Sequence, residues 1–501
     1  MGFDPHTLPT AVSQIDKLRN VTATYYISKA DSPKGLFRLT GACGIGKTQS
    51  SLRFGLIHAL RWNLKGIIYV GPLKSIIEQT ANIYRELLGE ANVLEHHSGF
   101  EPQLAEEKNY KLDTERWDKP FIVTSGVQFY ESLFSNSPSQ CRKLHNIANR
   151  VILIDEAQTI PLHLVKPILD VLKTLVEDWN CTVVLMSATQ PAFDRLKNIS
   201  FDATDIVPLE AVNEQFQANK RNTYRLQHET NWSWLDLAQD IKESGFSQSL
   251  TVVNTTKLSR VGYQQLSNLV PGNWFHLSAR MCPAHRAEVL QKVRECLDKN
   301  LPCNLISTQL VEAGVDIDFP RVYRQLGPLD SIIQTAGRCN RNNKLDTHNA
   351  VVTVFNVEGA NLPPGDYRNR IEITRAILQN NPNALNKDIQ VSMQQYFRAY
   401  FNDIHAGGDE IQKLRCSYDY PQVAKKFQVI DNDWQQSVVV PWGKGIDLIN
   451  ELHNKDIVSQ YDWRRLQQYT IALPNSCEQV IEQASGLKIW DGEYSQEFGA
   501  V

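Results

Sequence analysis

One eight-residue segment constrains the fold more than any other part of the chain. Residues 41–48 read GACGIGKT, which fits the pattern G-x-x-x-x-G-K-[ST]. The apolar stretch 36–40 precedes this segment, and the amphipathic stretch SLRFGLIHAL follows it. A strand, a glycine-rich turn and a helix in this order open a parallel α/β unit. The segment therefore predicts a parallel sheet with crossover helices and a phosphate site at the sheet's edge.

The chemistry of phosphate binding accounts for this spacing. Glycines let the backbone wrap phosphate groups with its N–H donors, and the following helix adds its positive N-terminal dipole. A lysine and a hydroxyl then reach the β- and γ-phosphates and a Mg²⁺ ion. A chance match in a glycine-containing loop is the alternative, and the flanking strand and helix disfavour it. The predicted nucleotide-binding residues are Gly41, Gly44, Ile45, Gly46, Lys47 and Thr48.

A second acidic motif ends another apolar stretch. Residues 151–158 read VILIDEAQ. We expect Asp155, with Thr48, to hold Mg²⁺, and Glu156 to polarise the attacking water as a general base. An ordinary strand end is the alternative, but parallel sheets bind ligands at this edge, and a phosphate loop lies upstream. Gln158 stands where an aspartate or histidine is more often found, and we include it among the nucleotide-binding residues.

The chain repeats its strand pattern after a polar interval. Apolar stretches that predict strands are 36–40, 66–70, 121–124, 151–154, 182–186, 249–253, 273–276, 304–307, 321–325, 350–357 and 437–440. The pattern predicts an α/β protein with two parallel-sheet domains, then a helical segment and a small C-terminal domain. The expected ranges are 1–205, 206–245 as a connection, 246–358, 359–420 as the helical segment, and 421–501.

The second domain carries a further set of polar residues. Residues 307–318 read STQLVEAGVDID, and 334–341 read QTAGRCNR. Two arginines three residues apart share one face of a helix, from which they could reach a nucleotide held by the first domain. Solvated arginines on a surface helix are the alternative. The residues predicted to act on the nucleotide from this domain are Gly314, Asp316, Gln334, Arg338 and Arg341.

Residues 185–189, LMSAT, close an apolar stretch beyond the acidic motif. We expect Ser187, Ala188 and Thr189 to couple nucleotide hydrolysis to the binding of a nucleic-acid strand. A Ser-Ala-Thr triplet alone is often only the end of a β-strand.

Composition narrows the cellular setting. The sequence contains no apolar stretch of about 18 residues, so no membrane span is predicted. The N-terminus lacks a signal-peptide pattern. The nine cysteines are scattered without a C-x-x-C pair, which favours a reducing cytoplasm and disfavours a zinc ribbon. The net charge of −3 gives no basic excess, so tight nonspecific nucleic-acid binding is disfavoured, although a local basic groove is compatible with it.

Taken together, the motifs resemble superfamily 2 helicases of the DExH/D-box type over residues 36–357. More narrowly, the chain resembles the CRISPR-associated helicases of type I interference. The segments that carry this resemblance include IIYVGPLKSIIEQTA, EHHSGF, LMSATQP, HLSARMCPAHR and PLDSIIQTAGRCNR, with a tail of FQVI, VVVPW and WRRLQQYTIALP.

The resemblance implies two tandem RecA-like domains that use ATP and Mg²⁺ to move along single-stranded DNA, 3′ to 5′. It further implies recruitment by an RNA-guided CRISPR surveillance complex after R-loop formation. Many members carry a fused HD nuclease, but this sequence has no adjacent His-Asp pair. We therefore expect a separate HD nuclease as partner, or a chain that is a fragment.

The resemblance also implies a set of strand contacts, for which a helix cap or turn is an equal alternative. They are Lys74, Ser75, Thr124, Ser125, Asn254, Thr255 and Thr308. His96 and His97 have no carboxylates at ligand spacing, which favours a structural or strand-contact role over a metal site. Segment 463–469 mixes cations with aromatics, and an amphipathic helix is favoured there over base stacking.

Other functions are compatible with parts of the same motif set. An RNA helicase or a restriction-type DNA translocase would share the whole motif set. A non-translocating ATP-switch module would share only the nucleotide site. A metal-dependent nuclease is disfavoured.

Overall fold

The computed structural model describes residues 3–42, 44–97, 107–188, 190–191, 193, 202–360, 363, 365–403, 407–430, 434–452, 455, 458–482 and 486–501. The chain separates into two compact units. Unit 1 comprises Met1–Lys220 and Gln390–Ile430, and unit 2 comprises Arg221–Ile389 and Asp431–Val501. Within the described ranges, every helix is too short or too polar to cross a lipid bilayer.

Unit 1 is built on a seven-stranded parallel sheet in the order β3-β4-β2-β5-β6-β1-β7. Both β2 and β5 are buried along their whole length, as central strands covered on two faces must be. The strands are β1 (Leu36–Thr40), β2 (Gly66–Gly71), β3 (Val93–His96), β4 (Phe121–Ser125), β5 (Arg150–Ile154), β6 (Thr182–Ser187) and β7 (Thr204–Asp205).

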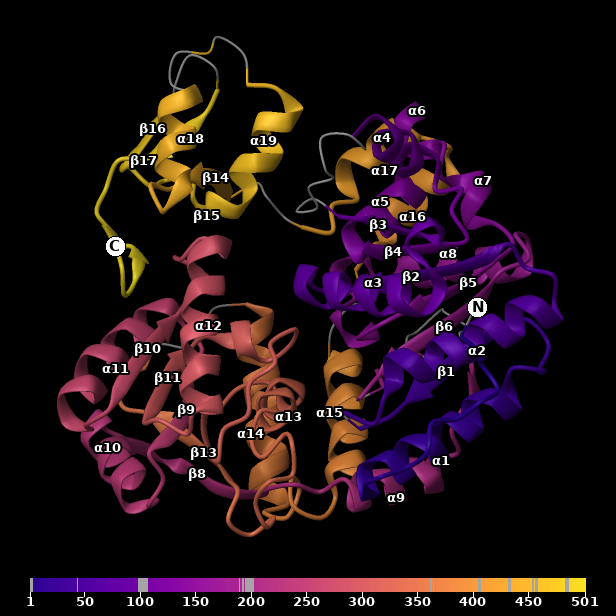
Figure 1. The fold of residues 1–501 in the computed structure, drawn as a ribbon. Helices are drawn as coiled ribbons and strands as arrows, with labels where there is room; N and C mark the ends of the chain where they lie inside the picture. The colour runs from indigo at the N-terminus through magenta and orange to yellow at the C-terminus, as the bar shows by residue number, and fades with distance from the viewer. Residues whose placement is uncertain are drawn as a thin grey trace. The chain divides into compact units, whose positions relative to one another are not determined.

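Helices cover both faces of this sheet (Figure 1). Apolar residues of α1, α2 and α3 form one core with alternate residues of the strands, among them Phe37, Tyr69 and Leu153. In Figure 1, α5 and α8 lie across the opposite face. The helices before the second unit are α1 (Gln14–Lys29), α2 (Lys47–Arg61), α3 (Lys74–Leu88), α4 (Glu107–Arg116), α5 (Gly126–Phe134), α6 (Pro138–Cys141), α7 (Leu144–Ile147), α8 (Val165–Glu177) and α9 (Leu209–Ala218).

Three later helices return to unit 1, namely α15 (Ile389–Asp403), α16 (Asp409–Cys416) and α17 (Tyr420–Lys426). Arg415 forms an ion pair with Asp170 of α8, with Nη1 and Oδ2 2.6 Å apart. The rings of Phe134 and Phe427 stack with centroids 3.8 Å apart. The range 359–420, expected to be one helical segment, is therefore divided between the two units.

Unit 2 contains a six-stranded parallel sheet in the order β10-β11-β9-β12-β13-β8. Helices α10 and α11 share one core with the sheet, and α12 and α13 share another. The elements are β8 (Thr223–Trp232), α10 (Trp234–Glu243), β9 (Gln248–Val252), α11 (Thr256–Leu269), β10 (Asn273–Leu277), α12 (Pro283–Asp298), β11 (Cys303–Ser307), β12 (Arg321–Gln325), α13 (Leu329–Ala336), β13 (Val351–Val357) and α14 (Asp366–Asn380).

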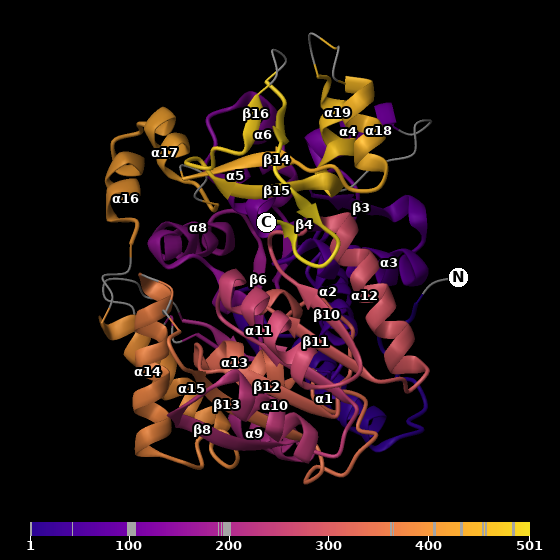
Figure 2. The same ribbon diagram turned by 90° about the vertical axis from the view of Figure 1, so that its left-hand side faces the viewer.

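The C-terminal part of unit 2 has its own small sheet, in the order β15-β14-β17-β16 (Figure 2). Its core also includes Cys282, and the rings of His285 and Trp442 stack with centroids 3.7 Å apart, so the small sheet packs on α12. The elements are β14 (Gln435–Val439), α18 (Lys444–Leu452), α19 (Gln460–Leu466), β15 (Thr470–Pro474), β16 (Val480–Glu482), β17 (Lys488–Trp490), β18 (Tyr494–Ser495) and β19 (Gly499–Ala500).

The predicted strands agree with the observed ones to within two residues at each end. The range 206–245, expected to be a connection, instead contributes α9, β8 and α10. Strand β8 lies at the edge of its sheet, and only one of its ten residues is buried. An edge strand of this kind carries no apolar run, so its sequence resembles that of a polar loop.

Candidate nucleotide site

Three of the predicted motifs meet at one edge of the unit 1 sheet. Strands β5, β6 and β1 are neighbours, and each motif follows the carboxyl end of one of them. Segment 41–48 follows β1, residues 155–158 follow β5, and Ser187 and Ala188 end β6. The third residue of the last motif, Thr189, lies outside the described residues. The strand order thus brings together the residues predicted to bind nucleotide in this unit.

The phosphate loop has the backbone that its glycines predict. Gly44 and Gly46 have φ of 83° and 79°, a left-handed conformation that costs glycine little. Gly46 is the N-terminal cap of α2, so the first turn of that helix begins at Lys47. The N–H of Gly41 donates to the carbonyl of Ser187, with N and O 3.1 Å apart. The loop is therefore fastened to β6 and leads directly into the N-terminus of α2, a position that suits a phosphate group.

Asp155 occupies a buried position at the end of β5. Its N–H donates to the carbonyl of Val70, and the hydroxyl of Tyr69 donates to its carboxylate. Burial and the neighbouring charge of Glu156 together raise the pKa of Asp155 to about 6, although Lys47 acts in the opposite direction. A carboxylate and the Thr48 hydroxyl are the hard oxygen ligands that Mg²⁺ prefers, so these residues fit a nucleotide with its metal ion.

Gln158 links the acidic motif to β6. Its amide Nε2 donates to Glu156 Oε2, and its Oε1 accepts from the Ser187 hydroxyl, each at 2.5 Å. Glu156 has a φ of 49°, a left-handed conformation in which its backbone N–H donates to Asp155 Oδ1 at 3.0 Å. The glutamine therefore makes a continuous hydrogen-bonded path from the predicted general base to the predicted coupling motif.

The predicted strand contacts of unit 1 follow β2 and β4, which are neighbours in the sheet. Lys74 and Ser75 are exposed at the start of α3. Thr124 is fully buried, and its hydroxyl donates to the carbonyl of His96 at 2.7 Å. Ser125 caps α5 by accepting from the N–H of Gln128. Lys74 and Ser75 are thus exposed, whereas Ser125 is half-buried and Thr124 is buried.

In unit 2 the predicted strand contacts follow β9 and β11. Asn254 is buried, and its side-chain amide donates to the carbonyl of Leu326 at 2.8 Å. Thr255 caps α11 by accepting from the N–H of Leu258 at 3.2 Å. Thr308 is also buried. These side chains shape the loops at this edge of the second sheet. The backbone N–H groups of Asn254 and Thr308 are also bonded within the unit, to Gln325 and to the carbonyl of Leu277.

The two arginines predicted to share a helix face do not lie on a helix. Helix α13 ends at Ala336, and Asn340 has a left-handed φ of 51°. The expectation of one helical face was wrong because a glycine follows Ala336 and the chain then turns into the bridge between Cys339 and Phe319.

Arg338 is buried and donates to the backbone carbonyls of Val311 and Glu312, each at 2.8 Å. Arg341 is one-third exposed, and its Nε lies 3.0 Å from a carboxylate oxygen of the exposed Asp316. Gly314 has a left-handed φ of 70°, and Gln334 is half-buried. Arg341 is the arginine of the pair with access to a ligand in this arrangement.

Two site residues escaped the sequence reasoning. Arg19 of α1 donates from Nε to the carbonyl of Gly44 at 3.1 Å, and Tyr69 of β2 holds Asp155. A lone arginine within a helix gives no sequence signal. A tyrosine in an apolar strand is normally assigned to the core, where its hydroxyl needs a partner.

The two adjacent histidines have structural roles. His97 is buried with its Nε2 2.8 Å from Glu95 Oε1, and the Trp117 indole donates to His96 at 2.9 Å. Across the described ranges, no three His, Cys, Asp or Glu side chains cluster as a metal site would require. Segment 463–469 continues α19 into a 3₁₀ turn over Gln467–Tyr469, which agrees with the favoured helix.

Comparison with known proteins shows which proteins two regions of this chain resemble. A DEAD/DEAH box helicase model matches residues 19–197, and a model of the C-terminal region of CRISPR-associated nuclease/helicase Cas3 matches residues 246–344. The loop after β1 and the acidic motif after β5 lie within the first of these two matches, and Arg338 and Arg341 lie within the second.

Individual relatives agree. The Cas3 of Haloferax volcanii is 25% identical over 63% of this chain and 46% of its own length. The putative Cas3 of Methanocaldococcus jannaschii is 24% identical over 61% of this chain and 44% of its own length. The chain spans about half the length of these curated relatives. The crystal structure of T. fusca Cas3-ADP aligns with a TM-score of 0.69 at 14% identity over 100% of this chain and 72% of that one. This likeness establishes the fold as two tandem RecA-like domains with a small C-terminal domain.

Proposed function

We propose that this chain is an ATP-driven translocase on single-stranded DNA that acts in CRISPR interference. The observation that carries the proposal is the hydrogen-bonded path from Glu156 through Gln158 to Ser187, beside the phosphate loop. It supports a site in which hydrolysis and the end of β6 are physically linked. Strand movement needs such a link between the nucleotide and the surface that binds the strand.

Each residue of the site has a chemical role in this proposal. The N–H groups of the loop and Lys47 bind the β- and γ-phosphates. Thr48 and Asp155 would hold Mg²⁺, which offsets phosphate charge when bound with ATP. Glu156 takes a proton from the attacking water. Arg341, as the exposed arginine of its motif, stabilises the charge that develops on the transferred phosphoryl group.

Contacts with a strand are assigned to the exposed groups beside this site. The Lys74 ammonium and the Ser75 hydroxyl suit phosphate contacts, which position a strand without reading its sequence. The neighbouring order of β2, β5 and β6 supports a strand path close to the nucleotide. The finer assignment, recruitment to an R-loop by an RNA-guided complex, is supported by the likeness to a chain of the structure titled "CRISPR RNA-guided surveillance complex, pre-nicking".

The first test is ATP turnover with single-stranded DNA, duplex DNA and RNA. We expect single-stranded DNA to stimulate turnover most, and stimulation by RNA alone would overturn the DNA assignment. Lys47→Ala should abolish both turnover and strand displacement, whereas Lys173→Ala, an exposed lysine of α8, should leave both unchanged. Normal ATP binding without any strand displacement by the wild type would favour a switch module instead.

The second test uses a target DNA that an RNA-guided surveillance complex has opened into an R-loop. We expect the displaced strand to stimulate ATP turnover in the presence of the complex. A chain that responds to free single-stranded DNA but not to the R-loop would retain the translocase assignment and lose the CRISPR one. A purified HD nuclease added to this reaction tests the proposed partner, whose DNA degradation should then depend on ATP.

A further inference from the structure

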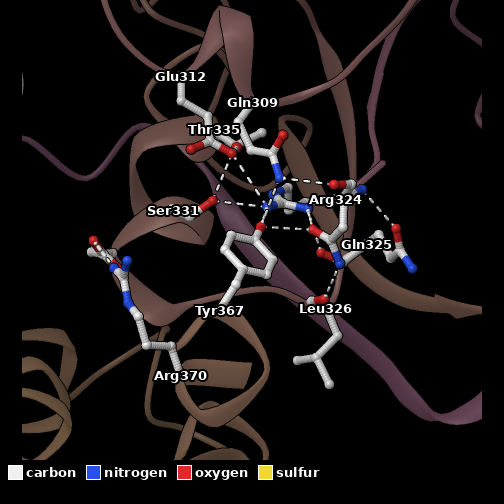
Figure 3. Close-up of polar contacts among 11 residues, drawn as sticks. Gln309, Glu312, Arg324, Gln325, Leu326, Ser331, Thr335, Tyr367 and Arg370 are labelled. Atoms are coloured by element: carbon white, nitrogen blue, oxygen red, sulfur yellow. Dashed lines mark hydrogen bonds and ion pairs between the residues drawn. The ribbon is translucent and has the colours of Figure 1, made fainter. Parts of the chain in front are cut away.

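A buried polar cluster in unit 2 connects the loops after its central strands (Figure 3). Arg324 of β12 is fully buried at its centre. Its Nη1 donates to Asn254 Oδ1 at 2.8 Å, and its Nη2 donates to Ser331 Oγ at 2.8 Å. We call this set the Arg324 cluster; its members are Asn254, Gln309, Glu312, Arg324, Ser331, Thr335 and Tyr367.

The hydroxyl of Tyr367 joins three members of this cluster. It donates to Asn254 Oδ1 at 2.9 Å, and it accepts from Gln309 Nε2 at 2.9 Å and from Arg324 Nη2 at 3.2 Å. Tyr367 lies in the first turn of α14, which follows the last strand of the sheet. One hydroxyl therefore ties α14 to the loop after β9 and to the loop after β11.

The loop after β11 is in turn fastened to α13. Glu312 accepts from the Ser331 hydroxyl at 2.6 Å and lies 3.3 Å from Arg324 Nη2. Arg338 holds the backbone of the same loop through the carbonyl of Glu312. Burial raises the pKa of Glu312 to about 7, although Arg324 acts in the opposite direction. This segment and α13 are thus connected through both side chain and backbone.

Burying charged and polar side chains costs free energy of desolvation, so a cluster of this kind does not fill a core for stability alone. Apolar residues of similar volume would give equal or greater stability than a buried ion pair. A satisfied polar network instead specifies one arrangement, because every displaced member would leave a buried group without a partner. The cluster includes Asn254 of the loop after β9 and Gln309 of the loop after β11, so these two loops are what it holds in one arrangement.

We propose that Tyr367 is a positioning residue that holds the loops after β9 and β11 in the arrangement that binds a nucleic-acid strand. This inference rests on the proposed function for its ligand. Tyr367 itself touches neither nucleotide nor strand in this scheme. Its hydroxyl acts through Asn254 and Gln309, whose loops carry the predicted contacts.

The decisive variant is Tyr367→Phe, which removes one oxygen atom and keeps the ring. Loss of a partly buried hydrogen bond of ordinary strength corresponds to about a five- to tenfold change in an equilibrium. We expect the single-stranded DNA concentration for half-maximal ATP turnover to rise about five- to tenfold. Turnover without DNA should stay at the wild-type rate. The matched control is Tyr461→Phe, a partly exposed tyrosine of α19 in the same unit.

Two further measurements separate positioning from other roles. Because no phosphate contact is removed, the dependence of DNA affinity on salt should keep the wild-type slope. Amide hydrogen exchange should become faster at 254–258 and 308–312 in Tyr367→Phe and remain unchanged in Tyr461→Phe. A wild-type DNA response in Tyr367→Phe, or an equal fall in turnover with and without DNA, would overturn the inference.

The exchange measurement also separates this inference from the proposed function. If the wild type responds to no nucleic acid, the translocase proposal fails. Faster exchange at the two loops in Tyr367→Phe would then still support positioning by the hydroxyl. Unchanged exchange would reject the inference whatever the nucleic-acid results.

Discussion

The guanidinium of Arg338 donates to the backbone carbonyl of Glu312, with Nη2 and O 2.8 Å apart. Its Nε makes a second such bond to Val311, and the side chain is buried. Arg341, three residues later, has a partly exposed side chain paired with Asp316. Two arginines of one motif therefore have different surroundings, and they should have different mutant phenotypes.

Arg338→Ala should destabilise unit 2, whereas Arg341→Ala should not. The first change leaves two buried carbonyls without their charged donor, which costs about 3 kcal/mol of the free energy of unfolding. The second removes a solvent-exposed ion pair, worth less than about 1 kcal/mol. Urea unfolding curves of both variants measure this difference. Equal stability of the two would contradict the assigned roles.

Arg341→Ala should bind ATP normally and hydrolyse it about 10³-fold more slowly, because an arginine that acts on the transferred phosphoryl group contributes on that scale. Single-turnover phosphate release, together with binding of a fluorescent ATP analogue, distinguishes the two steps. An unchanged rate in this variant would remove Arg341 from the catalytic group.

Glu156→Gln should also separate binding from hydrolysis. The substitution keeps the size of the side chain and removes the carboxylate that accepts the proton, so turnover should fall about 10²- to 10⁴-fold. Nucleotide affinity should change little. Glu177→Gln, at an exposed glutamate of α8, is the control and should behave as the wild type. Near-normal turnover in Glu156→Gln would require another general base.

The sequence predicts those strands and site residues whose pattern lies in consecutive positions of the chain. Strand β1 matches its predicted bounds because it is a short, mostly apolar stretch that ends at the glycine-rich loop, and β12 also matches its predicted bounds. Edge strand β8 was missed because its outward residues are polar. The phosphate loop and acidic motif could be recognised because the chemistry fixes residue type and spacing over eight consecutive positions. Neighbouring strands then bring these motifs together.

Contacts between residues that are far apart in the chain leave no pattern of residue type and spacing in the sequence. Arg324 and Tyr367 are 43 residues apart, and neither belongs to a spaced motif. The sequence predicted Asn254 as a strand contact, but its side chain is used by the Arg324 cluster. Likewise, Ala336 was expected to lie within a helix that continued through both arginines. The glycine after Ala336 and the bridge between Cys339 and Phe319 end that helix, and the bridge is a tertiary contact that the local sequence does not reveal.

Lys74 and Thr124 give a test of which predicted strand contacts are direct. Lys74→Ala should weaken binding of single-stranded DNA and lower the slope of log affinity against log salt by about 0.7, the value for one lost phosphate contact. Thr124→Val should leave that slope unchanged, because its buried hydroxyl bonds to His96. Affinity measured by fluorescence anisotropy at four salt concentrations decides this. Equal slopes in Lys74→Ala and the wild type would exclude a direct contact.

His276 should make unit 2 sensitive to acid. Burial lowers the pKa of this histidine to about 4, and its Nδ1 donates to the carbonyl of Glu497 at 3.0 Å. The unfolded chain binds this proton near pH 6.5 and the folded chain only near pH 4. Between these pH values the unfolded state therefore holds more protons than the folded state. The free energy of unfolding falls by about 1.4 kcal/mol for each unit by which the pH is lowered.

The contribution of His276 is thus complete above pH 6.5 and is lost as the pH falls toward 4. Urea unfolding at pH 7.5, 6.0 and 5.0 measures this loss. His276→Gln should show a shallower fall in stability over that interval, and the exposed His348→Gln should follow the wild type. The difference between wild type and His276→Gln isolates one group, since other buried histidines contribute equally to both. Parallel curves for those two proteins would mean that His276 titrates alike in the folded and unfolded chains.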